Sequence, residues 1–384
     1  EICACLVGSE MCIRDRNIDT AVSINIWYQD DAYTSYLDYI AQQFHKANEF
    51  ITVNPVKVEE NNLLDAVYNG SIAQNNVADV YLMEASDMQR AYLMGLTAEN
   101  DAYTQYYSQK HFPVTAVNAA CYEGKLYGYP VTFHTAVMVY NKKYATAPEN
   151  FEQIEAFLNS YQVTDENKDV NMIVGWDTQD LWTNYAFGGS YVDNGGAQGE
   201  DAESDAQTEA LKAAMTEYAA LQNTFGIVDK TQEEYKQMFI NNQLIYTILD
   251  STQLADLNAS GVDYGICAVP GAKTGFGTQS LSDTILAMVN PYSENTDTAK
   301  AVAQAISYDY ADLLEKDTGY ISARTDVADK NKKTLYQPLY EVYAKSDSYA
   351  KYIGADEFYV RYSILLHNIW KGEDLSLIHI SEPT

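Results

Sequence analysis

The sequence is poor in cysteine and in basic residues, and it has no long apolar run. Three of its five cysteines fall within the first sixteen residues. For the other two, Cys121 and Cys267, we expect free buried thiols, with a disulfide as the alternative. The 24 Lys and Arg residues face 54 Asp and Glu residues, for a net charge of −30. That field repels phosphate backbones and argues against a nucleic-acid partner. No apolar run is long enough to cross a bilayer.

Motifs of common enzyme classes are also absent. Residues 17–374 contain no G-x-S-x-G, H-E-x-x-H, G-x-x-x-x-G-K-[ST] or C-x-x-C motif. With 54 acidic residues, some carboxylate pair has a glycosidase-like spacing by chance, so such a pair carries no information. The stretch "DENKDVN" begins like a calcium loop, but Val170 stands where glycine is needed and Trp176 where glutamate is needed. We therefore expect no catalytic residue, no metal and no cofactor.

The two ends of the chain are expected to be foreign to the fold. Codons for "LSLIHISEPT" resemble a transposase-type sequencing adapter, and codons for "CLVGSEMCIRDR" resemble its reverse complement. Two ends that encode opposite strands of one oligonucleotide do not arise by chance. Residues 1–16 and 375–384 are therefore interpreted as translated adapter and left out of fold reasoning. We expect the native N-terminus, with any signal peptide, to be missing.

Hydrophobic residues make up 47% of the chain, which excludes disorder, and the length suits two domains of ordinary size. No repeat and no low-complexity linker separates them, which predicts lobes joined by several chain crossings. Tyrosine is abundant, 33 residues against 11 phenylalanines. Its ring offers an apolar face with a polar tip, which suits polar ligands and serves equally well in a core.

The first third of the chain alternates strand and helix patterns. "AVSINIWY" alternates apolar and polar residues and predicts a strand, and "SYLDYIAQQFHKA" has the apolar period of a helix. "ITVNPVKVEE", "NLLDAVYNGSIAQ" and "VADVYLME" continue as strand, helix and strand. This order predicts an α/β fold with a parallel sheet and right-handed crossovers. Ligands of such sheets bind beyond the carboxyl ends of the strands.

Further strands and helices are predicted in the rest of the chain. "GKLYGYPVTFHTAVMVYNKKYA" alternates and then becomes apolar throughout, so this strand should pass from a polar environment into a core. "NNQLIYTILDS", "VDYGICAVPG" and "TILAMVN" predict strands. "APENFEQIEAFLNSY", "SDAQTEALKAAMTEYAALQNTFG" and "TDTAKAVAQAISYDYADLLEKDTG" predict helices, the last closed by its glycine. "GWDTQDLWTNYAFGGSYVDNGG" is interpreted as a loop-rich stretch.

Six segments resemble, in the correct order, motifs of bacterial extracellular solute-binding proteins of the maltose-binding type. They are the "GKLYGYP … YNKKYA" segment, "VADVYLMEASDMQRAYLMGL", "MFINNQLIYTILDS", "VDYGICAVPG", "VNPYSENTDTAKAVAQAISY" and "DTGYISARTDV". The resemblance spans nearly all of residues 17–374. It implies a two-lobed periplasmic-binding fold of type II, in which each lobe is a mostly parallel sheet flanked by helices and a multi-strand hinge joins the lobes. The implied bounds are 17–132 with 277–325 for lobe 1, 137–270 with 328–374 for lobe 2, and hinge segments near 130–136, 270–277 and 324–329.

The resemblance also implies a function. Such a protein captures a mono- or oligosaccharide in a cleft between its lobes, closes by hinge motion, and delivers the sugar to the permease subunits of an ABC importer. It implies a monomer at the extracellular face of the cell membrane, held by a lipid anchor lost with the native N-terminus, or in the periplasm. A polyamine or another small polar solute in the same fold is the alternative. A secreted glycan-active enzyme is a weaker one.

Family ligand positions in lobe 1 fall at the ends of the first and third strands. Trp27 corresponds to the family's strand-end tryptophan, and Asp30 and Asp31 to acidic side chains that bind sugar hydroxyls. Glu84 and Ser86 follow the third strand on the same rim. Carboxylates accept several hydroxyl protons, and aromatic faces pack on sugar C–H groups. Strand packing for the tryptophan and a solvated surface for the acids are the plainer alternatives.

In lobe 2 the family keeps an aromatic side chain against the sugar. Asp177, Trp182 and Tyr185 lie in the corresponding stretch, and Trp176 competes for the aromatic position. Two tryptophans among Gly, Asp and Asn residues are hard to explain as ordinary core. The resemblance therefore implies that this stretch contacts the ligand.

The remaining family positions lie at the crossings and near the end of the chain. His134 aligns with an acidic ligand contact at the first crossing, and Asp283 lies on the return to lobe 1. Asp250 precedes Thr252, which replaces the family's tryptophan and argues against simple maltose specificity. Tyr359 aligns with the late family aromatic. A structural histidine and a core tyrosine are the plainer interpretations.

Overall fold

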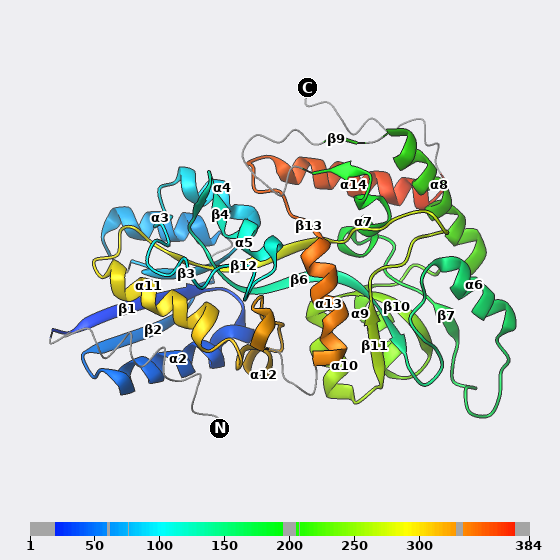
Figure 1. The fold of residues 1–384 in the computed structure, drawn as a ribbon, viewed down its shortest axis with the longest axis horizontal. Helices are drawn as coiled ribbons and strands as arrows, with labels where there is room; N and C mark the ends of the chain where they lie inside the picture. The colour runs from blue at the N-terminus through cyan, green and yellow to red at the C-terminus, as the bar shows by residue number, and fades with distance from the viewer. Residues whose placement is uncertain are drawn as a thin grey trace. The chain divides into compact units, whose positions relative to one another are not determined.

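The computed structural model describes residues 20–59, 62–75, 77–194, 205–206, 208–327 and 333–372 (Figure 1). The two expected adapter ends lie outside these residues. The described chain forms two compact units. Unit 1 holds the described residues of 20–133 and 283–327, and unit 2 those of 134–282 and 333–372. Which segments act as a hinge stays a prediction.

Unit 1 is built on the strand–helix alternation expected of the first third of the chain. The strands β1 (Val22–Tyr28), β2 (Ile51–Lys57) and β3 (Val80–Glu84) alternate with the helices α2 (Thr34–Ala47) and α3 (Leu63–Ala73). Both β2 and β3 pair with β1 in parallel, and β12 (Leu281–Val289) adds an antiparallel strand beside β3. The predicted parallel strands are confirmed.

The core of unit 1 lies on both faces of this sheet. From α2 the buried side chains are Tyr36, Leu37, Ile40 and Phe44, spaced as the helical period requires. The other core cluster joins residues of β1, α3 and β3 to the helices α4 (Met88–Leu93) and α5 (Val114–Ala119) and the hairpin β4 (Cys121–Tyr122) and β5 (Lys125–Leu126). This packing holds the carboxyl ends of β1 and β3 beside each other.

The helix predicted over "TDTAKAVAQAISYDYADLLEKDTG" is wrong in its continuity. It forms α11 (Thr296–Gln304), a π-helical turn η4 (Ala305–Asp309) and α12 (Leu314–Thr318). The hydroxyl of Tyr36 donates to the carbonyl of Ile306 at 2.7 Å, and Ser307 donates to Pro130. The hydroxyl of Tyr36 competes for a backbone acceptor of the helix, and such competition disturbs the regular ladder of hydrogen bonds. The closing glycine is confirmed, because Gly319 adopts φ +78°.

Unit 2 has a mixed sheet around β6 (Tyr129–Asn141), whose residues from His134 onward belong to this unit. The strands β10 (Leu244–Asp250) and β11 (Tyr264–Cys267) pair antiparallel with β6, and β7 (Met172–Val174) pairs parallel with β10. The short strand β13 (Asp347–Ser348) pairs parallel with the start of β12. The strands predicted from "NNQLIYTILDS", "VDYGICAVPG" and "TILAMVN" are confirmed. The strand β10 is buried along its whole length, which explains its unbroken apolar run.

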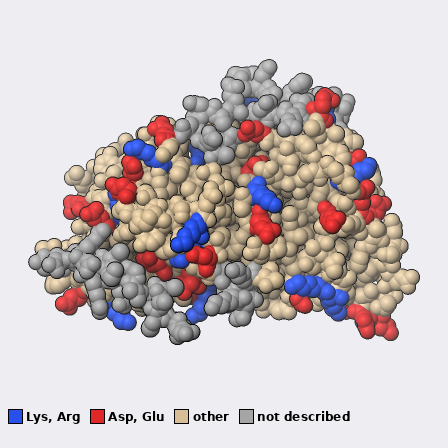
Figure 2. All heavy atoms as spheres, viewed as in Figure 1, with Lys and Arg blue, Asp and Glu red and all other residues tan. Residues whose placement is uncertain are grey.

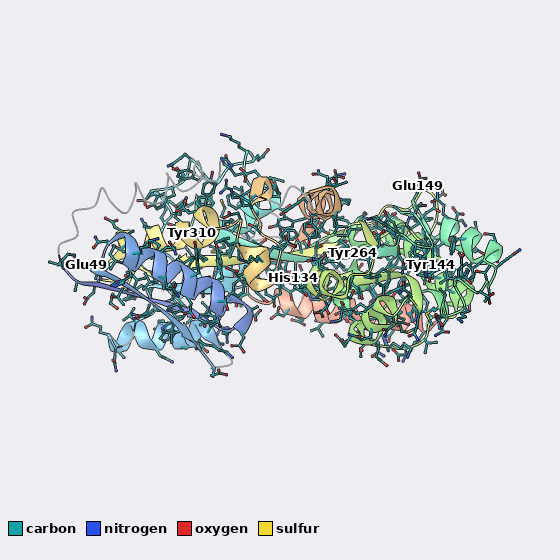
Figure 3. All side chains as sticks on the ribbon, turned by 90° about the horizontal axis from the view of Figure 1, so that it is seen from below. Glu49, His134, Tyr144, Glu149, Tyr264 and Tyr310 are labelled. Carbon is teal, nitrogen blue, oxygen red and sulfur yellow. The ribbon has the colours of Figure 1, made fainter. Side chains whose placement is uncertain are left out.

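Helices cover the sheet of unit 2. They are α6 (Phe151–Ser160), α7 (Leu181–Gly189), α8 (Thr208–Phe225), α9 (Gln232–Ile240), α10 (Leu254–Ser260), α13 (Lys333–Lys345) and α14 (Ala355–Trp370). Figure 1 shows α14, in red, beside α7 and α8, which it contacts. Figure 3 labels His134 on β6 and Tyr264 on β11.

The loop-rich interpretation of "GWDTQDLWTNYAFGGSYVDNGG" is wrong for its middle part, which is α7. Asp180 caps this helix by accepting a hydrogen bond from the backbone of Thr183 at 2.9 Å. The two glycines at the end resemble a loop signal but serve close packing. A Cβ at Gly188 would collide with the hydroxyl of Tyr362 on α14, and a Cβ at Gly189 with the carbonyl oxygen of Gln279.

We expect Gly189→Ala to lower the free energy of unfolding by about 1 to 2 kcal/mol, because the added methyl group overpacks a backbone contact that cannot rotate away. Alanine ordinarily stabilises a helix relative to glycine, so the steric effect must exceed that gain. Urea unfolding measures the difference. The matched control is Gly277→Ala, whose Cβ would lie 3.3 Å from the rotatable hydroxyl of Ser190. Equal stability of the two variants would contradict the packing argument.

None of the described helices combines the length and the apolar character needed to cross a bilayer. On the face shown in Figure 2, acidic residues are scattered between basic ones rather than gathered into one patch. Cys121 and Cys267 are thiols and not a disulfide, as expected, but each is half-buried and not buried.

Candidate functional site

In unit 1 a polar and aromatic group, the strand-end group, lies where β1 ends. Asp30 caps the short 3-10 helix η1 (Asp31–Tyr33) by accepting from the backbone of Ala32 at 2.9 Å, and it accepts a second hydrogen bond from the hydroxyl of Tyr320 at 2.7 Å. The rings of Tyr33 and Tyr320 lie 5.7 Å apart, and the hydroxyl of Tyr33 is 2.5 Å from Thr132. The strand-end group of Asp30, Tyr33 and Tyr320 thus combines an exposed carboxylate with aromatic faces.

The predicted residues Asp31 and Trp27 differ in setting. Asp31 is largely exposed and forms an ion pair with Lys57 at 2.8 Å. Trp27 is 7% exposed and belongs to the core cluster that also contains Met83. The structure therefore places Trp27 inside unit 1 and Asp31 at its surface beside Asp30.

Glu84 and Ser86 lie at the end of β3, beside the end of β1. Glu84 is exposed, and its charge, like that of Asp30, adds to burial in raising the pKa of Tyr33. Asp283 is buried on β12, two residues before Ile285, which pairs with Glu84. Its carboxylate accepts from the backbone of Thr284 at 2.6 Å. The predicted acids of unit 1 therefore gather at one end of its sheet, with Asp283 the buried member.

In unit 2 three predicted residues form a connected group, the imidazole–indole group of His134, Asp250 and Trp182. The Nδ1 atom of His134 lies 3.0 Å from Oδ2 of Asp250, and its ring centroid lies 4.4 Å from that of Trp182. Burial alone would raise the pKa of Asp250. The charge of His134 and hydrogen bonds from His134 and Thr252 outweigh it, so the pKa lies below its ordinary value. Asp250 is therefore ionised at neutral pH.

A row of aromatic rings continues from this group. Trp182 is half-buried and lies 5.8 Å from the ring of Tyr349, which stacks on Tyr359 at 3.8 Å. Tyr359 is 2% exposed and its hydroxyl accepts from Asn194 and from the backbone of Ala350. Tyr359 therefore supports the row from inside the unit, and Trp182 is its outer predicted member.

Tyr185 and Asp347 close the inner end of the row. The hydroxyl of Tyr185 donates to Asp347 at 2.9 Å, and Gln279 donates to the other carboxylate oxygen at 2.5 Å. Burial and the charge of Asp193 outweigh these hydrogen bonds and raise the pKa of Asp347 to about 7. Tyr185 is fully buried, so the structure places it behind the row.

Asp177 joins the same region through Gln232. Its carboxylate accepts from the backbone of Gln179 at 3.0 Å and from the backbone of Gln232 at 3.2 Å. The carbonyl oxygen of the Gln232 side chain accepts from the backbone of Asp250 at 3.0 Å. Trp176, the other candidate for the family's aromatic position, is fully buried, and its indole N–H donates to Asn184. The tryptophan of this stretch that stays partly exposed is therefore Trp182.

Sequence reasoning missed several residues of these groups, among them Tyr33, Tyr320, Tyr349 and Gln232. Tyr349 and Tyr320 are two of many tyrosines, and their contacts depend on segments distant in sequence, so no local pattern identifies them. Gln232 had a usable signal, because Thr231 and Glu234 form a capping box that fixes where α9 begins.

The comparisons with known proteins agree with this architecture. The maltodextrin-binding protein MdxE of Bacillus subtilis (strain 168) is 22% identical over 262 residues, a match that covers 64% of this chain and 60% of that protein. A cyclo/maltodextrin-binding protein solved with maltotetraose has a TM-score of 0.75 at 16% identity, with 94% of each chain covered. A Staphylococcus aureus extracellular solute-binding protein solved with maltose has a TM-score of 0.73 at 18% identity, covering 93% of this chain and 94% of that one.

These structural neighbours define the class: this chain has the two-lobed periplasmic-binding fold. The family of bacterial extracellular solute-binding proteins matches residues 39–338. The chain belongs to that family.

Proposed function

We propose that this protein captures a carbohydrate outside the cell and delivers it to an ABC importer. The observation that carries the proposal is the imidazole–indole group of unit 2, in which the ring of a half-buried tryptophan lies against an imidazole that is bound to an ionised, buried carboxylate. The relatives named for maltodextrin or maltose support a carbohydrate as the ligand class.

The aromatic and carboxylate side chains of the two units suit an uncharged ligand that is rich in hydroxyl groups. An indole face packs on sugar C–H groups, whereas carboxylates accept hydrogen bonds from hydroxyls. We propose that Trp182, His134 and Asp177 contribute from unit 2. From unit 1 the proposed contributors are Asp30, Asp31, Glu84 and Tyr320. Trp27, Tyr185, Asp250, Asp283 and Tyr359 are proposed to support these residues from within each unit, because all five are buried.

A polyamine is the alternative ligand that the acidic strand ends favour. Asp30 and Glu84 are exposed carboxylates at one end of the sheet, and a diammonium compound would pair with them. However, Asp31 already pairs with Lys57, which lowers the negative charge available there. The carbohydrate is therefore the better fit.

Isothermal titration calorimetry with maltose, maltotriose and maltotetraose, set against putrescine and spermidine, tests the ligand class. We expect heat with at least one oligosaccharide and none with the amines. Glycan chromatography after incubation checks that no sugar is cleaved, since the relatives are named as binding proteins. Heat with the amines alone would contradict the carbohydrate assignment, and a shortened glycan would make the protein an enzyme.

The partners and the location follow from the same proposal. We propose the permease subunits of an importer as partners and a lipid anchor at the extracellular face of the membrane or a periplasmic location. Intact flanking DNA tests this, because a lipobox upstream and permease genes next door are expected.

A further inference from the structure

Gln232 contacts two separate segments of unit 2, the residues before α7 and the end of β10. It is the first residue of α9, and its backbone N–H donates to Oδ2 of Asp177 at 3.2 Å. Its side-chain Nε2 donates to Oδ2 of Asp180 at 3.0 Å, and its Oε1 accepts from the backbone N–H of Asp250 at 3.0 Å. One side chain therefore joins the start of α7 to the end of β10.

Each segment that Gln232 joins carries a member of the imidazole–indole group. Asp180 is the N-cap of α7 and lies two residues before Trp182. Asp250 ends β10, and its carboxylate contacts His134, whose ring lies against that of Trp182. The distance between the imidazole and the indole thus depends on two elements that Gln232 ties together.

A neutral amide is the group that this position requires. Gln232 must donate to one carboxylate and accept from one N–H, and an amide offers both at its two ends. Ionised glutamate would keep the acceptor and lose the donor, and it would add a fourth negative charge to Asp177, Asp180 and Asp250. Protonated glutamate, in contrast, has one O–H donor and one carbonyl acceptor, as the amide does.

The surrounding charges favour protonation of a glutamate at this position. Burial and the charges of Asp177 and Asp250 raise the pKa of Asp180, although hydrogen bonds from Thr183 oppose the shift. On α9 itself, Glu233 pairs with Lys236, which also pairs with Asp256, and Glu234 belongs to the capping box. On β6, His134 is bound to Asp250. Lys230 also pairs with Glu234. Taken together, the acids near this position still outnumber Lys230, Lys236 and His134, so an introduced carboxyl should titrate above its ordinary range.

We propose that Gln232 is a positioning residue of the ligand site, which sets Trp182 against His134 without touching the ligand. The inference rests on the proposed carbohydrate function. Its distinctive consequence is that Gln232→Glu converts ligand affinity into a pH-dependent quantity, because the variant regains the amide's hydrogen-bond pattern only when protonated.

The test compares Gln232→Glu with Gln237→Glu, which places the same charge on an exposed position of the same helix. Titration calorimetry with the best-binding oligosaccharide of the panel gives affinities at pH 5 and pH 7.5. We expect Gln232→Glu to bind about tenfold more weakly than the unsubstituted protein at pH 7.5 and within about threefold at pH 5. Gln237→Glu should match the unsubstituted protein at both. Unchanged binding, or an equal loss at both pH values, would overturn the proposal.

A second measurement keeps this proposal separate from the carbohydrate assignment. Tryptophan emission of the ligand-free Gln232→Glu variant between pH 5 and pH 8 should show a transition that the unsubstituted protein and Gln237→Glu lack. Adding Trp182→Phe should remove that transition. If no oligosaccharide binds but the transition is present, the proposed function fails and the positioning role stands. A flat emission profile defeats the positioning role.

Discussion

Replacing Trp182 by alanine is expected to weaken carbohydrate binding about 100-fold, which corresponds to about 2.7 kcal/mol. Trp182 is half-buried and lies between the rings of His134 and Tyr349. Alanine removes the stacking surface and also leaves those two rings without their common neighbour. Aromatic anchors in such positions commonly dominate the binding free energy. Titration calorimetry with the best-binding oligosaccharide of the panel measures the loss.

A conservative variant separates loss of the surface from loss of structure. Trp182→Phe keeps an aromatic face against Tyr349 and should lose about tenfold rather than 100-fold. Urea midpoints of both variants show whether unit 2 stays folded. Binding of Trp182→Ala within twofold of the unsubstituted protein would remove Trp182 from the ligand site.

The first strands and helices could be predicted because their patterns are local. The alternation around Ile24 and Ile26 and the helical period of Leu37, Ile40 and Phe44 each report one buried face. In α7 the same rules fail, because Thr183, Asn184, Tyr185 and the two glycines are all buried and leave no amphipathic pattern. A helix that is buried on all sides has no solvent-exposed polar face, so its sequence does not show the period of an amphipathic helix.

The candidate site was predictable where residues adjoin strand ends and unpredictable where distant segments meet. Asp30 and Glu84 follow strands, so topology alone places them at one end of the sheet. Tyr320 and Tyr349 reach their partners from 290 and 167 residues away, as the contacts with Asp30 and Trp182 show. No local sequence pattern reveals such pairs, because only the tertiary fold brings the two segments into contact.

Burial has opposite outcomes at two acids of unit 2, and the difference predicts how stability depends on pH. At Asp250 the charge of His134 and three hydrogen bonds, one from His134 and two from Thr252, overcome burial, so the folded protein favours the ionised form. At Asp347 two neutral donors, Tyr185 and Gln279, do not overcome burial and the charge of Asp193, so the pKa rises to about 7. A carboxyl with a raised pKa holds its proton in the folded state at pH values where the unfolded chain has lost it.

We therefore expect Asp347→Asn to remove a pH-dependent loss of stability. Asp347 has a pKa of about 7 in the folded state and about 3.9 in the unfolded chain. Its contribution to the free energy of unfolding is therefore fully present below pH 4. It declines as the pH rises to about 7 and is lost above that. At pH 8 the free energy of unfolding of Asp347→Asn should exceed that of the unsubstituted protein by about 2 to 4 kcal/mol, with near equality at pH 4.

Urea unfolding at pH 4, 6 and 8 measures this effect on the Asp347→Asn variant. Glu341→Gln is the matched control, because it removes one negative charge from an exposed position of α13 without disturbing a buried group. The control should shift stability by a few tenths of a kcal/mol at every pH, as an exposed charge does. The asparagine keeps an acceptor for the hydroxyl of Tyr185, so the inner end of the aromatic row should persist. Parallel pH profiles of the unsubstituted protein and Asp347→Asn would show that Asp347 is already ionised in the folded state at neutral pH.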